Sequence, residues 1–495
     1  MGQKKKTKHD PLFNLDLNPG YLHFRRTKIV ASIGPSSWSP EMLRKLMAKG
    51  LDVARINFSH ETGETHLKTI RRIRRVAKEM GKNVAILADL CGPKIRVGKF
   101  KDGAVTLRKG AEVEITTKTV LGTEKLIPSQ YLNIGKETRI GDKVFLDDGN
   151  LELKIISKAK GKLLARVING GLLKNHKGMN LPDTPLSISA MTPKDRNDVV
   201  FAVKGGVDFV ALSFVRKADD VKMLRRMLVK LKSNAGIIAK IEKPEALGNI
   251  RAIVDAADGI MVARGDLGVE LPARKVPIIQ NKLIAVANEA DKPVIVATQM
   301  LESMIKNVRP TRAEVTDVAG ACLAGADATM MSAETAAGDH PLEAFSAMDA
   351  ILRETEAYQF FAQGRRFPKA GQRINSNVEA AIGTAAAQIT RDLEIRAVFV
   401  LTRTGRSAQV VSADRPSAPI LALMPSEEIS RRMRLYWGVV PFVIKQQFKT
   451  EDCLHCAEQI IKDLKLAKSG NHILLISGVG KSGIAANSVV IHQIS

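Results

Sequence analysis

The stretch GIMVARGDLG, residues 259–268, decides the fold, because a β-branched apolar run ends there in charged residues and glycines where a helix is expected to begin. Short runs of this kind recur along the chain, and each is followed by a stretch with helical periodicity. The other runs start at Thr27, Asp52, Val84, Asp208, Gly236, Pro293 and Asp327. Eight runs, most of them about 25 to 35 residues apart, predict an α/β fold of the (β/α)8 TIM-barrel type.

One interval in this series is much longer than the others. The third and fourth runs, at Val84 and Asp208, start about 120 residues apart. Residues 92–192, between them, alternate apolar and polar residues between glycine turns, as in TRIGDKVFLDDGNLEL from Thr138. This pattern predicts a small inserted β-barrel domain. The insert leaves the main barrel at the carboxyl end of a strand, where barrel active sites lie, so we expect it to act as a lid.

The apolar pattern changes again near the end of the chain. We expect residues 19–91 and 193–357 to form the barrel around the insert, and residues 358–495 to form a separate C-terminal α/β domain with a regulatory role. In this last domain a predicted helix from Val378 precedes several short apolar strands. Residues 1–18 are expected to form a basic N-terminal tail.

The composition is that of an ordinary globular protein. Hydrophobic residues make up 45% and charged residues 26% of the 495 residues, which excludes disordered, collagen-like and disulfide-framework proteins. No run reaches about 18 uncharged apolar residues, and the basic start lacks the apolar stretch of a signal peptide, so we expect a cytoplasmic protein with no membrane partner. The four cysteines are too few and too dispersed for a metal or disulfide role.

The charge balance is strongly basic. Lysine and arginine outnumber aspartate and glutamate by 76 to 51, a formal net charge of +25, which suits nucleic acid or small phosphorylated anions. Aromatic residues make up only 4% of the chain, too few for base-stacking platforms. We therefore expect no nucleic acid as the main partner. An RNA-binding protein is the alternative, and it predicts binding that depends strongly on salt.

Polar residues gather at the carboxyl ends of the predicted strands, which face the pocket of a barrel. Each of them alone has an alternative reading as a surface ion pair or a helix cap, but together they form a convergent set. Its members are Arg55, Asn57, Ser59, His60, Asp89, Ser213, Lys240, Glu242, Arg264, Asp266, Thr298, Gln299, Ser332 and Glu334.

Four of these residues point to a chemistry. Glu242 and Asp266 end neighbouring strands, where their carboxylate oxygens are expected to share one small divalent cation, as magnesium prefers. The alternative is that both cap helices. Lys240 lies on the same side of its strand as Glu242, and Arg55 adds a second cation. Two cations beside a metal ion favour phosphoryl transfer, which needs positioning and positive charge.

Several strings of the sequence, taken together and in order, resemble the motifs of the pyruvate kinase family. The resemblance extends from about Arg25 to Ser495, and it implies three domains arranged as above. The strings include RRTKIVASIGPSS from Arg25, ARINFSHE from Ala54, ILADLCGPKIRVG from Ile86, IIAKIEKPEAL from Ile237, GIMVARGDLGVELP from Gly259, VATQMLESMI from Val296 and DATMMSAETAAGDHP from Asp327.

The resemblance implies transfer of the phosphoryl group of phosphoenolpyruvate to ADP, giving pyruvate and ATP in the last step of glycolysis. On matching positions, Glu242 and Asp266 hold Mg²⁺ or Mn²⁺, and the catalytic residues are Lys240, Arg55 and Thr298, the last as a proton relay with water. The implied substrate-binding residues are Arg55, Ser213, Lys240, Gly265, Asp266 and Thr298. The implied nucleotide-binding residues are Asn57, His60, Arg96 and Lys177.

One departure from the family pattern concerns potassium. Many members bind K⁺ through residues that match Asn57, Ser59, Asp89 and the backbone at Leu90, with a glutamate where this chain has Lys94. The fixed ammonium of Lys94 is expected to replace the electrostatic role of the ion. We therefore predict an enzyme that does not require potassium. The alternative is that Lys94 points to solvent and K⁺ still binds.

The C-terminal domain carries a candidate effector loop. LTRTGRSA from Leu401 places hydroxyls, a base and helix-start amides in one turn, which suits a phosphate. By resemblance, Thr402, Arg403, Thr404 and Ser407 bind a phosphorylated allosteric activator, such as a sugar phosphate or AMP, and the protein is a homotetramer. A second loop, SGVGKSG from Ser477, lacks the tryptophan and arginine of many family members, so it leaves the activator open.

A second enzyme class remains open on the same barrel. A magnesium-dependent aldolase or lyase that acts on pyruvate enolates would also use Glu242 and Asp266. Lys240, Arg55 and a lid that contacts the nucleotide favour the kinase.

Overall fold

The computed structural model describes residues 22–495 apart from 160–161, 363–366, 368–376, 445–449 and 479–485. Two expected features therefore lie outside the described residues, namely the basic tail of residues 1–18 and most of the loop that starts at Ser477. Among the described residues, no helix is both long and apolar enough to span a membrane.

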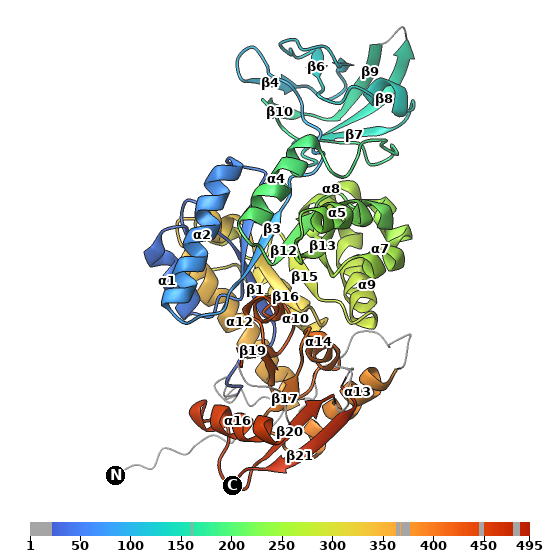
Figure 1. The fold of residues 1–495 in the computed structure, drawn as a ribbon. Coiled ribbons are helices and arrows are strands. Elements are labelled where there is room, and N and C mark those ends of the chain that lie inside the picture. Colours follow the sequence, from blue (N-terminus) through green and yellow to red (C-terminus); the bar gives the residue numbers. More distant parts are fainter. Residues whose placement is uncertain (1–21, 160–161, 363–366, 368–376, 445–449, 479–485) are drawn as a thin grey trace, which may run out of the picture.

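Eight parallel strands close into a barrel at the centre of the molecule (Figure 1), which confirms the predicted fold class. Each strand coincides with one of the apolar runs of the sequence, and nearly all of their residues are buried. In chain order the strands are β1 (Lys28–Ser32), β2 (Val53–Asn57), β3 (Ala85–Asp89), β12 (Phe209–Leu212), β13 (Gly236–Ile241), β14 (Gly259–Ala263), β15 (Val294–Ala297) and β16 (Ala328–Met331).

Amphipathic helices surround the barrel. Helix α1 shows why they form, because the Ser39 side chain accepts the Met42 N–H, Pro40 occupies the first turn, and Leu43 and Leu46 are buried against the sheet. The longer helices are α1 (Pro40–Ala48), α2 (Gly63–Glu79), α4 (Pro193–Lys204), α5 (Ala218–Lys230), α7 (Ile250–Ala256), α9 (Val276–Glu289), α10 (Arg312–Leu323) and α12 (Pro341–Ala362). Short helices follow three strand ends, and they are α6 (Pro244–Gly248), α8 (Arg264–Glu270) and α11 (Ala333–Ala336).

The insert after β3 forms a separate β layer at one end of the barrel, at the top of Figure 1. Its strands alternate buried and exposed residues and enclose an apolar core of their own. A six-stranded sheet has the order β11-β7-β8-β9-β5-β6, and β10 pairs with β4. The bounds are β4 (Ala104–Leu107), β5 (Glu112–Thr116), β6 (Leu126–Pro128), α3 (Ile134–Glu137), β7 (Lys143–Leu146), β8 (Leu151–Ala159), β9 (Lys162–Asn169), β10 (Gly171–Lys174) and β11 (Met179–Asn180).

The C-terminal α/β domain lies at the opposite end of the barrel, at the bottom of Figure 1. Its sheet has the order β19-β18-β17-β20-β21, and β21 is an antiparallel edge strand. The elements are α13 (Val378–Asp392), β17 (Val398–Leu401), α14 (Arg406–Ala413), β18 (Ile420–Met424), α15 (Glu427–Met433), β19 (Val439–Val443), α16 (Thr450–Asp463), β20 (His472–Ser477) and β21 (Ser488–Gln493).

An aspartate precedes every second strand of the barrel, at the end away from the lid. Asp52, Asp208, Asp258 and Asp327 each accept a backbone N–H of the preceding strand, at 2.7 to 3.0 Å. Arginines of the C-terminal domain bind three of these four carboxylates, and the pairs are Arg434 with Asp52, Arg431 with Asp208 and Arg415 with Asp327. These ion pairs fix the C-terminal domain to the barrel.

We expect Asp327→Ala to destabilise the protein by about 3–5 kcal/mol, because it leaves the Arg415 guanidinium buried without its partner. The Arg415 and Asp327 side chains are only 2% and 6% exposed, with 2.9 Å between Nη1 and Oδ1. The matched control is Asp258→Ala, since Asp258 holds the same position on β14 but is 36% exposed and pairs with Arg225. Urea-induced unfolding of both variants measures the difference, and equal losses of stability would contradict this account.

Candidate active site

Lys240, on β13, lies at the centre of the polar cluster that the sequence predicts. Its Nζ is 2.9 Å from Glu242 Oε1 and 3.2 Å from Asp89 Oδ1, and it donates to Ser213 Oγ at 2.7 Å. Burial lowers the pKa of Lys240, but the carboxylates of Asp89 and Glu242 outweigh burial, and the net shift is upward. The ammonium is therefore a permanent positive charge at the mouth of the barrel.

Arg55, on β2, provides the second cation of this cluster. Its Nε donates to Asp89 Oδ2 at 2.7 Å, and its Nη1 donates to Ser32 Oγ at 2.7 Å. Asp89 is therefore shared by Arg55 and Lys240. Burial raises the pKa of Asp89, but the two cations lower it by a larger amount. The net shift of the pKa is downward, so the carboxylate stays ionised. The shared aspartate holds both cations in place beside the pocket.

Glu242 and Asp266 follow β13 and β14, as expected for a pair of metal ligands. Burial raises the pKa of Glu242, Lys240 lowers it, and the nearby charge of Asp266 raises it again. Glu242 Oε2 accepts the Phe214 N–H at 2.7 Å, which fixes the orientation of its carboxylate. No group of three or more His, Cys, Asp or Glu side chains suited to a metal occurs among the described residues. Two neighbouring carboxylates, one of them buried, fit a small divalent cation that takes its other ligands from substrate and water.

Thr298 follows β15 in a strained conformation, with φ of 70°, which is unusual for a β-branched residue. Its Oγ1 accepts the Gly265 N–H at 2.7 Å and donates to Ala297 O at 2.6 Å. Arg264 holds this turn, since its Nη2 donates to Thr298 O at 2.6 Å. The turn therefore brings a hydroxyl and the first amides of α8 together beside Asp266.

The residues expected at the potassium and nucleotide sites fall into two groups. At the barrel, Asn57 Oδ1 accepts the Ser59 N–H at 3.2 Å, and Leu90 O accepts from Ser213 Oγ at 2.7 Å. The His60 carbonyl accepts from a ring nitrogen of His66. On the lid, Arg96 Nη1 donates to His176 O at 3.0 Å, and Lys177 Nζ is 2.7 Å from Asp147 Oδ1.

Lys94 has ion-pair partners that the sequence did not indicate. Its Nζ is 3.8 Å from Asp266 Oδ1 and 3.6 Å from Asp148 Oδ1 on the lid. Asp147, Asp148 and Gly149 all have positive φ, from 51° to 88°, and in this lid turn Asp148 pairs with Lys94 whereas Asp147 pairs with Lys177. The charge of Lys94 thus lies beside a predicted metal ligand, whereas Asp89 is paired with Arg55 and Lys240.

Other predicted strand-end residues have structural roles. Glu334 accepts the backbone N–H groups of Leu301 and Ser332, so it joins two loops. In the C-terminal domain, Thr402 Oγ1 accepts the Gly405 N–H at 2.9 Å, and Gly405 has φ of 90°. This turn leads into α14, with Thr402 and Ser407 buried and Arg403 and Thr404 exposed.

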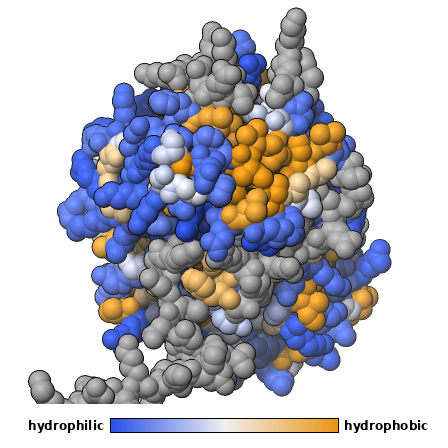
Figure 2. All heavy atoms as spheres, turned by 90° about the horizontal axis from the view of Figure 1, so that it is seen from below, coloured by the Kyte–Doolittle hydropathy of each residue, from blue (hydrophilic) through white to orange (hydrophobic). Residues whose placement is uncertain are grey.

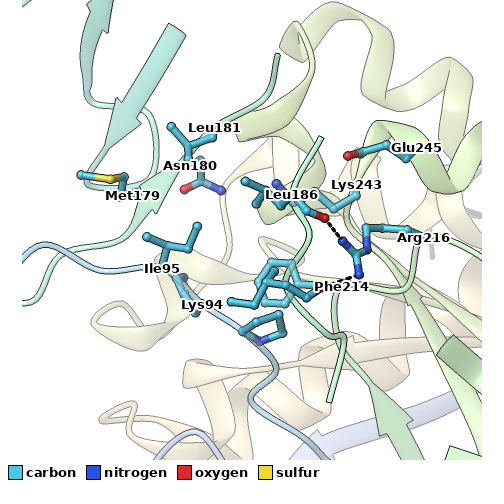
Figure 3. Close-up of a pocket in the computed structure, with 12 residues that line it drawn as sticks. Lys94, Ile95, Met179, Asn180, Leu181, Leu186, Phe214, Arg216, Lys243 and Glu245 are labelled. Carbon is cyan, nitrogen blue, oxygen red and sulfur yellow. Dashed lines mark hydrogen bonds between the residues drawn. The ribbon is translucent and has the colours of Figure 1, made fainter. Parts of the chain in front are cut away.

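Sequence reasoning missed the residues that join the lid to the barrel. They are Asp148, Asn180, Arg216, Lys243 and Glu270. A pocket of about 30 Å³ lies at this junction, and Figure 3 shows its lining from both domains. The acidic turn DDG at residues 147–149 was a usable signal for one of them, because its second acid, Asp148, pairs with Lys94.

The chain is similar to known proteins over nearly its whole length. The sequence model of the family "Pyruvate kinase, barrel domain" matches residues 24–345, and that of "Pyruvate kinase, alpha/beta domain" matches residues 380–492. A pyruvate kinase of Geobacillus stearothermophilus is 42% identical over 95% of this chain and 81% of its own length. Pyruvate kinase 2 of a Synechocystis strain is 42% identical over 94% and 78%. The crystal structure of a pyruvate kinase from Cryptosporidium parvum superposes with a TM-score of 0.89 at 35% identity, covering 96% of this chain and 97% of that one.

Proposed function

The chain belongs to the pyruvate kinase family, and we propose that it transfers the phosphoryl group of phosphoenolpyruvate to ADP, giving pyruvate and ATP. The observation that carries this proposal is the position of Lys240 between Asp89, Glu242 and Ser213, beside a second buried cation. Phosphoryl transfer depends mainly on positioning and on positive charge around the moving group. Two cations fixed by one aspartate supply both.

The divalent metal that the family generally uses fits Glu242 and Asp266. When bound there, Mg²⁺ or Mn²⁺ would neutralise charge on the substrate and on the moving phosphoryl group. The protein would hold the rest of phosphoenolpyruvate by its two ends. Arg55, Lys240 and Ser213 would bind the phosphate, and the Gly265 and Asp266 amides with the Thr298 hydroxyl would bind the carboxylate.

The enolate left after transfer must gain a proton at carbon. Thr298 is the side chain proposed for this relay, together with water, because its hydroxyl is held next to the Gly265 amide. A threonine hydroxyl is a weak acid, so its role is to orient a proton that comes through water. The closed lid would hold Arg96 and Lys177 against the nucleotide, with Asn57 and His60 on the barrel side, and would exclude water that hydrolyses the phosphoryl group.

The test of this function is the formation of pyruvate from phosphoenolpyruvate, ADP and Mg²⁺, followed with a coupled lactate dehydrogenase assay. We expect pyruvate and ATP to appear in equal amounts, and no pyruvate above background without ADP. The outcome that favours the lyase has two parts. Pyruvate formation from phosphoenolpyruvate would not depend on ADP, and the protein would cleave an aldol of a 2-keto acid to release pyruvate.

We also expect activity in tetramethylammonium buffer to lie within about twofold of activity in potassium buffer, because a fixed ammonium needs no added ion. Lys94 supports this, with its Nζ 3.8 Å from Asp266 Oδ1. Lys94→Glu should lose activity without potassium and regain part of it when the ion is added. Lys177, a lid lysine paired with Asp147, is the control position, since Lys177→Glu should gain no potassium dependence. Activity of the unaltered enzyme that requires potassium would contradict the expectation.

We further propose that the enzyme is a cytoplasmic homotetramer that a phosphorylated metabolite activates, with domain limits as expected from the sequence. The turn at Thr402 supports the effector site, because it offers hydroxyls and helix-start amides. Figure 2 shows a continuous apolar patch on the lower face of the molecule. An exposed apolar patch of this kind marks a surface for protein–protein contact. In the C-terminal domain, Val378 on α13 and Ile491 on the edge strand β21 are 65% and 46% exposed. Light scattering would measure the subunit number.

A further inference from the structure

One of the contacts between the lid and the barrel involves a buried acid, Glu270, the last residue of α8. Its Oε1 accepts from Asn180 Nδ2 at 2.8 Å and from Lys243 Nζ at 2.7 Å. Asn180 lies on lid strand β11, whereas Lys243 follows β13 of the barrel, and Figure 3 shows both side chains at the same pocket. The Glu270 side chain is only 1% exposed. One atom, Glu270 Oε1, thus contacts both a lid residue and a barrel residue at this pocket.

We propose that Asn180 and Glu270 form a latch that holds the lid closed over the active site. The proposal rests on the proposed function, since it assigns positioning residues for that reaction. Glu270 is the fixed half of the latch, because Lys243 neutralises and orients its carboxylate inside the barrel. Asn180 is the moving half, because it is carried by the lid.

The position of Glu270 connects the latch to the chemistry. Helix α8, Arg264–Glu270, starts with Gly265 and Asp266 and ends with Glu270, so the substrate-facing amides and the latch share one short helix. Lys243 is the residue after Glu242. Both predicted metal ligands are therefore within a few residues of a latch contact. When the lid is closed, it contacts the same elements that would hold the metal and the substrate.

Two further contacts show that the lid lies against α8 and that the linker out of the lid is bonded to the barrel. An added Cβ at Gly149, in the acidic lid turn, would lie 3.6 Å from Val269 Cγ1, so this turn approaches α8 closely. The linker out of the lid is held by Arg216, whose guanidinium donates to Leu186 O and Ile188 O, both at 2.6 Å (Figure 3). The linker stays attached to the barrel when the lid moves, and Asn180 is the part that leaves Glu270.

The energetics favour a reversible latch. A hydrogen bond between a neutral amide and a buried carboxylate is strong enough to favour closure, but it is a single bond that can break and form again. Lys243 remains with Glu270 when Asn180 leaves, so the carboxylate is never without a cation. Among the described residues, Glu270 Oε2 has no hydrogen-bond partner, which leaves Oε1 as the atom that carries both contacts.

The test exchanges the amide and the carboxylate of the latch between its two residues. Asn180→Asp sets two carboxylates against each other and should open the lid, whereas Asn180→Asp combined with Glu270→Gln restores an amide facing a carboxylate and should close it again. The matched control is Asn169→Asp, because Asn169 is an exposed lid asparagine whose amide donates to Asn150 O within the lid. Lid opening is read from energy transfer between fluorophores at Lys162 on the lid and Lys222 on the barrel, which are 71% and 60% exposed.

We expect Asn180→Asp to lower energy transfer, to raise the KM for ADP about tenfold with a smaller change in kcat, and to increase ADP-independent pyruvate release. The double variant should recover all three readouts, and Asn169→Asp should change none. If Asn180→Asp matches the control, or if the double variant does not recover, the latch is wrong. Energy transfer needs no catalysis, so a protein that makes no pyruvate would overturn the proposed function and still test the latch.

Discussion

Replacing Lys240 by methionine should lower kcat for pyruvate formation by at least about 10³-fold, because it removes the one charge that contacts both Glu242 and Asp89 inside the pocket. Methionine keeps the length of the side chain but cannot offset the negative charge that moves with the phosphoryl group. The binding of phosphoenolpyruvate should weaken less than kcat falls, since Arg55 remains. Steady-state kinetics with ADP in excess would separate the two effects.

The neighbouring Lys243 is the control for this experiment. It is a lysine of the same loop, its side chain is 9% exposed, and it pairs with Glu270 rather than with Asp89. Lys243→Met should therefore affect closure of the lid and the KM for ADP, and it should leave most of kcat. An equally large loss of kcat in Lys243→Met and Lys240→Met would contradict a special role for Lys240. Either buried lysine would then affect the reaction only by keeping the protein folded. Thermal unfolding of both variants checks that each is folded.

The barrel was predictable because each of its strands is a short, mainly apolar run that is buried on both faces. Because parallel strands end on the same side of a barrel, the sequence also placed Lys240, Glu242, Asp266 and Thr298 at one end of it. The alternating pattern of residues 92–192 predicted the inserted β domain, and the structure bears out the fold class. The residue pattern favoured a kinase over a lyase through Lys240 and Arg55, and the resemblance named the substrates.

Contacts that depend on side-chain direction were not predictable. Asp89 pairs with Arg55 and Lys240, which the sequence did not indicate, and its contact with potassium stays a prediction. Lys94 has Asp148 and Asp266 as partners, and its replacement of the ion stays a prediction too. Glu270 ends a short helix, where an acid has no distinctive pattern, and its partner Asn180 lies on a strand about 90 positions earlier. Such pairs join domains, so no local periodicity reveals them.

Glu242→Gln should raise the Mg²⁺ concentration needed for half-maximal activity by about 10²-fold, because one of two carboxylates that would hold the ion loses its charge. The amide oxygen can still accept the Phe214 N–H, which Glu242 Oε2 accepts at 2.7 Å, so the loop after β12 should keep its shape. The substitution also removes a partner of Lys240, whose ammonium then has Asp89 as its remaining carboxylate partner at 3.2 Å. Maximal kcat at saturating Mg²⁺ should therefore fall too, but by less than in Lys240→Met.

Direct binding of Mn²⁺, followed by electron paramagnetic resonance, separates metal affinity from catalysis. The unaltered protein should bind Mn²⁺ more tightly than Glu242→Gln, and more tightly still when phosphoenolpyruvate is present, because the substrate would complete the ion's oxygen ligands. Asp258→Asn is the control, since this carboxylate accepts the Ile237 N–H at the opposite end of the barrel and should leave Mn²⁺ binding unchanged. Equal Mn²⁺ affinity in Glu242→Gln and in the unaltered protein would show that Glu242 is not a metal ligand. The raised pKa of Glu242 would then reflect burial and the neighbouring Asp266 without a shared cation.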